Sequence, residues 1–275
     1  GRRGVSLPFT DHCPALLGSE DEAAALWRNA VILGKDRRWK YLELRGERII
    51  PAGSPPLLTF FEHELKLSSA ETALFAGLEP SVRRALRKSQ ESGLKVEVSR
   101  SPVAMSAYFD LHCTTRQRHG LPPQPVRFFD NLTRQLLAHD RGLIVLARYR
   151  EKSVAAAVFL HFGKRAIYKY GASDVSFQHL RPNNLVMWQA ICYFAARDFK
   201  SLHFGRTSLA NEGLRRFKRG FGAQERTLQY FRYHFGHREF VQAADRSNTF
   251  VNRFFRLLPQ PALRLAGRLT YPHLS

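Results

Sequence analysis

The residues best suited to chemistry lie between positions 183 and 232. Arg206 lies just after a strand predicted over 201–204, and Lys218 lies in a short basic helix predicted over 212–219. We expect both side chains to face one cleft. Guanidinium and ammonium groups bind phosphate or carboxylate, and they stabilise an oxyanion that develops on a reacting carbonyl. The pattern therefore favours an anionic substrate and a catalytic role for Lys218.

These side chains also have simpler interpretations. Arg206 could form an ion pair with Asp174 or Asp198, and Lys218 could be a surface lysine. Phe217, which precedes the lysine, is better explained by core packing than by catalysis, although contact with a substrate is the sharper hypothesis.

The start of a helix predicted over 182–198 is a second place that suits an anion. Asn183 and Asn184 open this helix, and Arg181 precedes them. Backbone amides and the helix dipole favour negative charge at a helix start. We therefore expect a donor or acceptor anion there, with Arg181 as a side-chain contact.

Two further groups are candidates for the cleft. Asp11 and His12 follow a strand end, where such a pair can act as a general base or a substrate anchor; a capped turn is the alternative. His119 lies in a polar loop between helices predicted over 103–118 and 126–139. His112 is seven residues away, but no third ligand is apparent, so no metal site is predicted.

A helix predicted over 80–92 carries four cations on its outer side. Its inner face is formed by small and apolar residues at helical spacing, and its outer lines hold Arg83, Arg84, Arg87 and Lys88. Such a cluster attracts phosphate groups and nucleic acid. A solvated basic face is the alternative.

The composition also favours polyanionic partners. The chain has 43 Lys and Arg against 23 Asp and Glu, a formal net charge of +20. tRNA, phosphorylated precursors and anionic lipid surfaces fit this charge, although an arginine-rich genome would also produce it.

The three cysteines have no metal or disulfide spacing, and no apolar run is long enough to span a bilayer. We predict a cytoplasmic location, extending to the inner face of the membrane.

The order of the predicted elements indicates the fold class. Two helices precede an antiparallel meander of strands, and a helix, a strand, a short helix and a last strand follow; the strands lie at 143–149, 153–162, 165–170, 201–204 and 227–233. This order resembles the GNAT acyltransferase fold, an α+β fold whose mixed sheet splays where an acyl donor inserts.

One segment departs from the GNAT pattern. The coenzyme A loop of that fold is a glycine-containing turn at the start of the central helix, whereas residues 178–184 read QHLRPNN. Without glycine, a close backbone cradle for pyrophosphate is not expected. We predict no resident cofactor, and this loop argues against acyl-coenzyme A as the donor.

Several ordered motifs resemble the FemAB/FemX-like aminoacyltransferase family. They are SLPFTDHC at 6–13, VRRALRK at 82–88, RHGLP at 118–122, YKYGAS at 168–173, RPNN at 181–184, FGR at 204–206 and LRRFK at 214–218. The branch that fits best is labelled lipid II:glycine glycyltransferase or is associated with exosortase and exopolysaccharide systems.

The resemblance implies a tandem GNAT-like fold that moves an amino acid from tRNA to an amine of a peptidoglycan or other envelope precursor. It places Phe217 and Lys218 near the precursor's phosphates and the reacting carbonyl, and it makes Tyr170 a substrate contact. The precursor would be nucleotide-linked or lipid-linked. The rival hypotheses are an acyl-coenzyme A N-acyltransferase and a non-catalytic module that binds polyanions or membranes.

The resemblance also implies a division of the sequence. Residues 1–93 would form a first GNAT-like unit, incomplete at its start and ending in the basic helix, and 94–240 the transferase unit. Residues 241–275 form a basic amphipathic tail, which is expected either to lie on an anionic membrane or to pack back on the domain.

Overall fold

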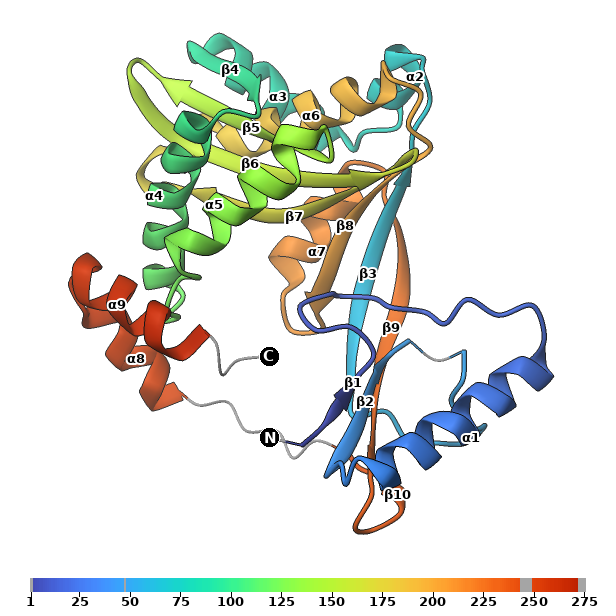
Figure 1. Cartoon of the computed structure of the whole chain (residues 1–275). Helices are drawn as coiled ribbons and strands as arrows, with labels where there is room; N and C mark the ends of the chain where they lie inside the picture. Colours follow the sequence, from blue (N-terminus) through green and yellow to red (C-terminus); the bar gives the residue numbers. More distant parts are fainter. Residues whose placement is uncertain (1, 47, 243–248, 272–275) are drawn as a thin grey trace. The chain divides into compact units, whose positions relative to one another are not determined.

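The computed structural model describes residues 2–46, 48–242 and 249–271 (Figure 1). The chain forms two compact units. The first holds residues 1–63, 206–215 and 225–246, and the second holds 64–205, 216–224 and 247–275. Parts of the predicted tail, 243–248 and 272–275, lie outside the described residues. The predicted division of the sequence into GNAT-like units, with boundaries at 93/94 and 240/241, stays a prediction.

The first unit combines a short sheet with one long helix. Its elements are β1 (Gly4–Val5), α1 (Glu20–Asp36), β2 (Tyr41–Arg45), the start of β3 (Leu58–Lys66), most of β9 (Gln224–His234) and β10 (Glu239–Phe240). β2 pairs parallel to β1 and antiparallel to β9. Ser19 caps α1 by accepting a hydrogen bond from the Glu22 amide, and Trp27 of α1 packs against Tyr233 and Phe240.

The second unit contains the meander predicted from the sequence. Its strands are β4 (Leu94–Ser99), β5 (Gly142–Tyr149), β6 (Lys152–Phe162), β7 (Arg165–Ser173) and the start of β8 (Ser201–Ser208). β4 to β7 are antiparallel neighbours, and β8 pairs parallel to β7. The mixed α/β sheet confirms the predicted fold class.

Helices cover both faces of this sheet (Figure 1). The helices of this unit are α2 (Glu71–Ala76), α3 (Pro80–Glu91), α4 (Pro102–Arg118), α5 (Val126–Gln135), α6 (Pro182–Ala195), the end of α7 (Glu212–Gly220), α8 (Thr249–Leu257) and α9 (Gln260–Thr270). The last two, α8 and α9, pack against α4 rather than on the sheet. Short 3-10 turns lie at Leu137–His139 and Val175–Leu180.

The central strands are buried on both faces because their side chains alternate between two cores. Leu143 and Val145 of β5 pack in the cluster that contains α3 and α6, whereas Ile144 and Leu146 pack in the cluster that contains α4 and α5. Period-two alternation along a strand sends neighbours to opposite faces. This explains why β5 and β6 read as continuous apolar runs.

Three element predictions need correction. The predicted helix 126–139 ends at Gln135 and gives way to the 3-10 turn at Leu137–His139, which closes at Asp140 with a φ of 54°. The helix 182–198 ends at Ala195. The strand 201–204 continues to Ser208, so Arg206 lies within β8. No described helix has the length and apolar character needed to cross a membrane.

Candidate active site

The sheet of the second unit opens between β7 and β8. The parallel ladder described between them runs from Arg165–Ser201 to Ile167–His203. β7 then continues along β6 to Ser173, and β8 continues beyond His203. Beyond the ladder, the Gly205 amide donates to His203 Nδ1 at 3.0 Å, so its partner is a side chain of its own strand rather than β7.

A β-bulge lies directly beyond the last β7–β8 pair. Val158 of β6 is opposite Tyr170 and Phe159 is opposite Tyr168, so Lys169 is an extra residue on β7. In a regular strand the two tyrosines would share a face. The bulge sends Tyr168 to the core beneath α6, beside Phe159, and Tyr170 to the opposite core.

Gly171 is required by the position of the Tyr168 ring. A Cβ atom at Gly171 would lie 1.7 Å from the Tyr168 hydroxyl oxygen, which is an impossible contact. Burial raises the pKa of Tyr168 to about 12, so this hydroxyl stays protonated at neutral pH. The motif at 168–173 therefore forms a β-bulge at Lys169 and places the Tyr168 ring against Gly171.

The far end of β7 is tied to α4 and to the start of α6. The Ser173 amide donates to Thr115 Oγ1 at 3.1 Å, and Asn183 Nδ2 donates to Ser173 Oγ at 3.2 Å. The Asn184 amide donates to the carbonyl of Arg181, and Pro182 has no N–H. This helix start consequently presents fewer amide donors than the sequence suggested, while the Arg181 side chain is exposed.

Lys218 is buried in the second unit. Its side chain is 2% exposed, and Nζ donates to the Gly205 carbonyl at 2.9 Å. The surface-lysine interpretation is therefore wrong. Gly205 lies two residues beyond the last described β7–β8 pair, so a buried lysine amino group sits next to the opening. Charges interact more strongly in a buried environment than in water.

Phe217 has the packing role that the simpler interpretation assigned to it. Its ring meets Phe221 edge-on, with ring centroids 5.2 Å apart, and it packs against the core that contains α6. The Glu79 amide donates to the Gly220 carbonyl at 2.9 Å, which fixes the end of α7 to the start of α3. This packing holds the backbone of Lys218 in place.

Arg206 belongs to the first unit, where two aromatic rings surround it. Its guanidinium carbon lies 4.5 Å from the centroid of Phe60 and 5.3 Å from that of Tyr230. Its Nε is 3.7 Å from Asp11 Oδ1. Asp174, one of the two predicted ion-pair partners of Arg206, accepts a hydrogen bond from Lys152 Nζ at 2.8 Å; a pair of Arg206 with Asp174 or Asp198 stays a prediction.

The structure brings Asp11 and His12 near other charged groups of the first unit. Asp11 faces Arg206, and His12 Nδ1 lies 3.0 Å from Glu62 Oε2. Because Arg206 and Lys218 belong to different units, their shared cleft stays a prediction.

The remaining predicted contacts are distributed over the second unit. Tyr170 packs edge-on against Phe128 and Phe129, and His119 is exposed at the end of α4. The basic cluster lies along α3 as predicted: Val82, Leu86 and Ser89 are buried, and the exposed cations are Arg84, Arg87 and Lys88, with Arg83 half-buried.

Sequence reasoning missed a partly buried ionic group in the first unit. Glu225 accepts hydrogen bonds from Arg215 at 2.7 and 2.8 Å, and its carboxylate lies 3.0 Å from Nε2 of the fully buried His63. The Arg215 hydrogen bonds hold the pKa of Glu225 below its usual value. The sequence feature that could have revealed this group is His63, whose imidazole lies on the inward side of a strand.

A buried histidine in the second unit gives a pH-dependent stability. His112 lies between Tyr108, whose hydroxyl is 3.1 Å from Nδ1, and Gln124, whose Oε1 is 2.7 Å from Nε2. Burial, with a smaller contribution from the Arg116 charge, lowers the pKa of His112 to about 4. The unfolded chain binds a proton near pH 6.5 and the folded chain does not, so stability falls as pH falls from 6.5 towards 4.

We expect this loss to be about 3 kcal/mol. Urea unfolding at pH 7 and pH 4.5 measures it, with His112→Asn as the variant that lacks the titrating group. The difference between wild type and variant should shrink as pH falls. Parallel pH profiles would contradict the assignment.

Comparisons with known proteins agree with this geometry. The model of the acetyltransferase (GNAT) domain matches residues 80–219. The structure of FemX superposes with a TM-score of 0.60 at 12% identity, covering 81% of this chain and 82% of that one. No protein of curated function matches the sequence significantly.

Two further solved structures share the fold. The C-terminal domain of a putative lysylphosphatidylglycerol synthetase from Agrobacterium fabrum has a TM-score of 0.58 at 12% identity, over 84% of this chain and 77% of that one. L-PGS from Bacillus licheniformis has a TM-score of 0.54 at 12% identity, over 98% of this chain and 84% of that one.

Proposed function

Because this chain belongs to the acetyltransferase (GNAT) domain family, and is therefore a transferase with a FemX-like fold, we propose that it moves an aminoacyl group. The proposed donor is aminoacyl-tRNA, and the proposed acceptor is an amine of a peptidoglycan or other cell-envelope precursor. The observation that carries the proposal is the opening between β7 and β8 with the buried Lys218 beside it.

The proposed step is attack of the acceptor amine on the ester carbonyl of the donor. A C–N bond forms, the C–O bond to the terminal ribose of the tRNA breaks, and the proton lost by the amine ends on the ribose oxygen. Lys218 stabilises the negative charge on the carbonyl oxygen or on a nearby phosphate. Asp11, His12 and Arg206 of the first unit are proposed to hold the acceptor.

The loop before α6 supports a donor other than acyl-coenzyme A. Arg181 caps the helix with a φ of 61°, a conformation that glycine adopts more readily, and Pro182 lacks an amide hydrogen. A side chain at this position keeps a pyrophosphate away from the backbone. An ordinary acyl-coenzyme A acyltransferase is therefore the second candidate.

The names of the solved relatives support an envelope substrate. FemX and a putative lysylphosphatidylglycerol synthetase share the fold, and the sequence motifs resemble enzymes that use charged tRNA. Since charged tRNA is made in the cytoplasm, we propose that the reaction takes place there.

Donor choice is tested by label transfer. The protein is incubated with envelope precursors and either tRNA carrying a labelled amino acid or labelled acetyl-coenzyme A. Label from tRNA on an acceptor supports the proposal. Label from coenzyme A alone would assign the second candidate, and consumption of neither donor would overturn both.

The outer side of α3 is proposed to bind the tRNA backbone. Replacing Arg84, Arg87 and Lys88 with alanine removes three exposed charges while leaving the buried face of α3 intact. We expect tRNA affinity to fall at least 10-fold near physiological salt. The slope of the logarithm of the binding constant against the logarithm of the salt concentration should become less negative by about 0.7 for each phosphate that the variant no longer neutralises.

Fluorescence anisotropy at several salt concentrations measures this effect. A matched control removes three exposed cations at the surface of α1: Arg28, Lys35 and Arg37. An equal loss in the control would show that net charge, not α3, determines binding. A flat salt response of the wild type would rule out phosphate binding by α3 altogether.

A further inference from the structure

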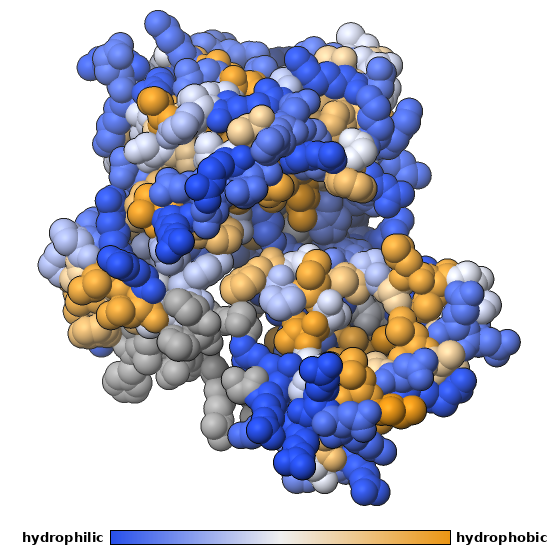
Figure 2. All heavy atoms as spheres, in the orientation of Figure 1, coloured by the Kyte–Doolittle hydropathy of each residue, from blue (hydrophilic) through white to orange (hydrophobic). Residues whose placement is uncertain are grey.

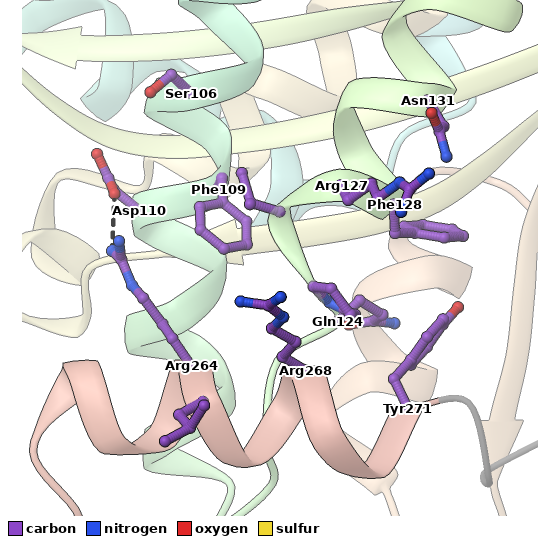
Figure 3. A pocket seen from close by; sticks show the side chains of 13 residues that line it. Ser106, Phe109, Asp110, Gln124, Arg127, Phe128, Asn131, Arg264, Arg268 and Tyr271 are labelled. Carbon is purple, nitrogen blue, oxygen red and sulfur yellow. Dashed lines mark hydrogen bonds and ion pairs between the residues drawn. The ribbon is translucent and has the colours of Figure 1, made fainter.

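A cavity of about 840 Å³ lies between α4, α5 and α9 of the second unit (Figure 3). Its walls are largely apolar and come from Phe109, Val126, Phe128, Leu265 and Tyr271. Three arginines also line it, namely Arg127, Arg264 and Arg268. The proposed transfer reaction uses none of these residues.

The charges of this cavity are unbalanced. Asp110, the acid in its lining, accepts a hydrogen bond from Arg264 at 2.9 Å. Within the described part of the chain, Arg127 and Arg268 have no carboxylate partner. Figure 3 shows Arg268 rising from α9 toward Phe109 and Gln124. Two uncompensated guanidinium groups beside apolar walls suit an anion that carries a hydrocarbon part.

A hydrogen-bond chain from α4 holds the side chain of Gln124, which lines the cavity. The Tyr108 hydroxyl donates to His112 Nδ1, and His112 Nε2 donates to Gln124 Oε1 at 2.7 Å. Because the carbonyl oxygen of Gln124 is used in this way, its amide NH₂ group is the remaining donor of this lining side chain. Together with Arg127 and Arg268, this amide gives the cavity the donors that an oxyanion requires.

Helix α9 is fixed against α4 and the following loop. Leu263 is fully buried, and a Cβ at Gly267 would lie 2.1 Å from the Pro123 carbonyl oxygen, so glycine is needed for this contact. Gln117 of α4 donates to the Leu258 carbonyl at 2.7 Å, and Gln260 donates to Gln117. Of the two predicted behaviours of the tail, packing back on the domain is the one observed for α9.

Packing still leaves α9 with two rows of solvent-accessible side chains, a basic row beside the cavity and an apolar row. Arg264 and Arg268 are four residues apart, as are Leu265 and Leu269, so each pair shares one helix face. Leu265 is 55% and Leu269 is 63% exposed; on α8, Phe254 is 60% and Leu257 79% exposed. Figure 2 shows hydrophobic and hydrophilic residues side by side over α9. Basic and apolar side chains together are typical of surfaces that lie on anionic bilayers.

We propose that α8 and α9 dock on an anionic membrane surface and that the cavity between α4, α5 and α9 receives the phosphate and upper hydrocarbon of an anionic phospholipid. Arg127, Arg268 and the Gln124 amide bind the phosphate. Leu265 and Leu269 enter the interfacial region. This site is separate from the opening between β7 and β8, and its occupancy does not depend on the transfer reaction.

Cosedimentation with vesicles tests the proposal. Vesicles of phosphatidylcholine with about one third phosphatidylglycerol are compared with pure phosphatidylcholine near 0.1 M salt. We expect binding to the anionic vesicles only. The variant Arg127→Ala/Arg268→Ala should weaken it about 30-fold, since each basic side chain near the surface contributes about fivefold.

The control removes the same charge at the other end of the sheet. Arg165 is the first residue of β7, and Ser173, which is hydrogen-bonded to α4, is the last. The length of this strand, roughly 27 Å, exceeds the Debye length of about 10 Å. Arg165→Ala/Lys200→Ala should therefore change binding less than threefold. Equal losses in both double variants would overturn the site.

A second variant and a competitor make the test independent of the arginine variant's folding. Leu265→Ser/Leu269→Ser changes two exposed side chains and should reduce vesicle binding at least 10-fold with an unchanged melting temperature. Inorganic phosphate at 10 mM should not displace the protein from vesicles. Unimpaired binding of the leucine variant, or full displacement by phosphate, would contradict docking on a lipid surface.

Discussion

Replacing Lys218 with methionine is expected to reduce the transfer rate about 100- to 1000-fold. Methionine has a similar length and fills the buried position without a charge. The variant removes the donor that lies 2.9 Å from the Gly205 carbonyl at the edge of the opening. Loss of one preorganised donor to an oxyanion has an effect of this size.

The fold of the Lys218→Met variant should survive. An unmade hydrogen bond at Gly205 costs about 1 kcal/mol, which thermal unfolding can measure beside the rate. Arg219→Ala is the matched control, because Arg219 is the exposed cation that follows Lys218 on α7. A folded methionine variant with a rate within threefold of wild type would remove Lys218 from the mechanism.

Replacing Gly171 with alanine is expected to destabilise the second unit by about 1–3 kcal/mol. The new methyl group would lie 1.7 Å from the Tyr168 hydroxyl oxygen and 2.7 Å from the ring carbon that carries it. Either the ring or the bulge at Lys169 must then move. Since the bulge borders the opening, we also expect a lower transfer rate. Chemical denaturation and the transfer assay measure the two effects.

A double-mutant cycle with Tyr168→Phe shows whether the clash is the cause. Removing the hydroxyl removes the worst clash, so Gly171→Ala should cost less when combined with Tyr168→Phe, with a coupling energy of about 0.5–2 kcal/mol. The remaining ring carbon at 2.7 Å should prevent full recovery. Strictly additive effects would mean that Gly171 is needed for another reason.

The elements with strong periodic patterns could be predicted from the sequence. The helix 80–92 is predictable because Val82, Leu86 and Ser89 repeat at helical spacing, and all three are buried. The meander is predictable because apolar runs alternate with turns. Helix ends are harder to predict: the break at Leu136 and the left-handed Asp140 depend on tertiary packing rather than on Gly or Pro.

The candidate site could be predicted only in part. The charge of Lys218 indicates chemistry, but its burial depends on packing of α7 against α3, which no local pattern reveals. The bulge at Lys169 is hidden because Tyr168 and Tyr170 look like neighbours on one face of a regular strand. The cavity beside α9 is formed by segments more than 100 residues apart in the sequence.

The chemical nature of the product bond tests the central claim most directly. After transfer from a labelled aminoacyl-tRNA, the labelled product is treated with hydroxylamine at mild pH, which cleaves esters and leaves amides intact. Aminoacyl transfer to an amine predicts that the label stays on the acceptor. Release of the label would show an ester to a hydroxyl group and would contradict the proposed reaction.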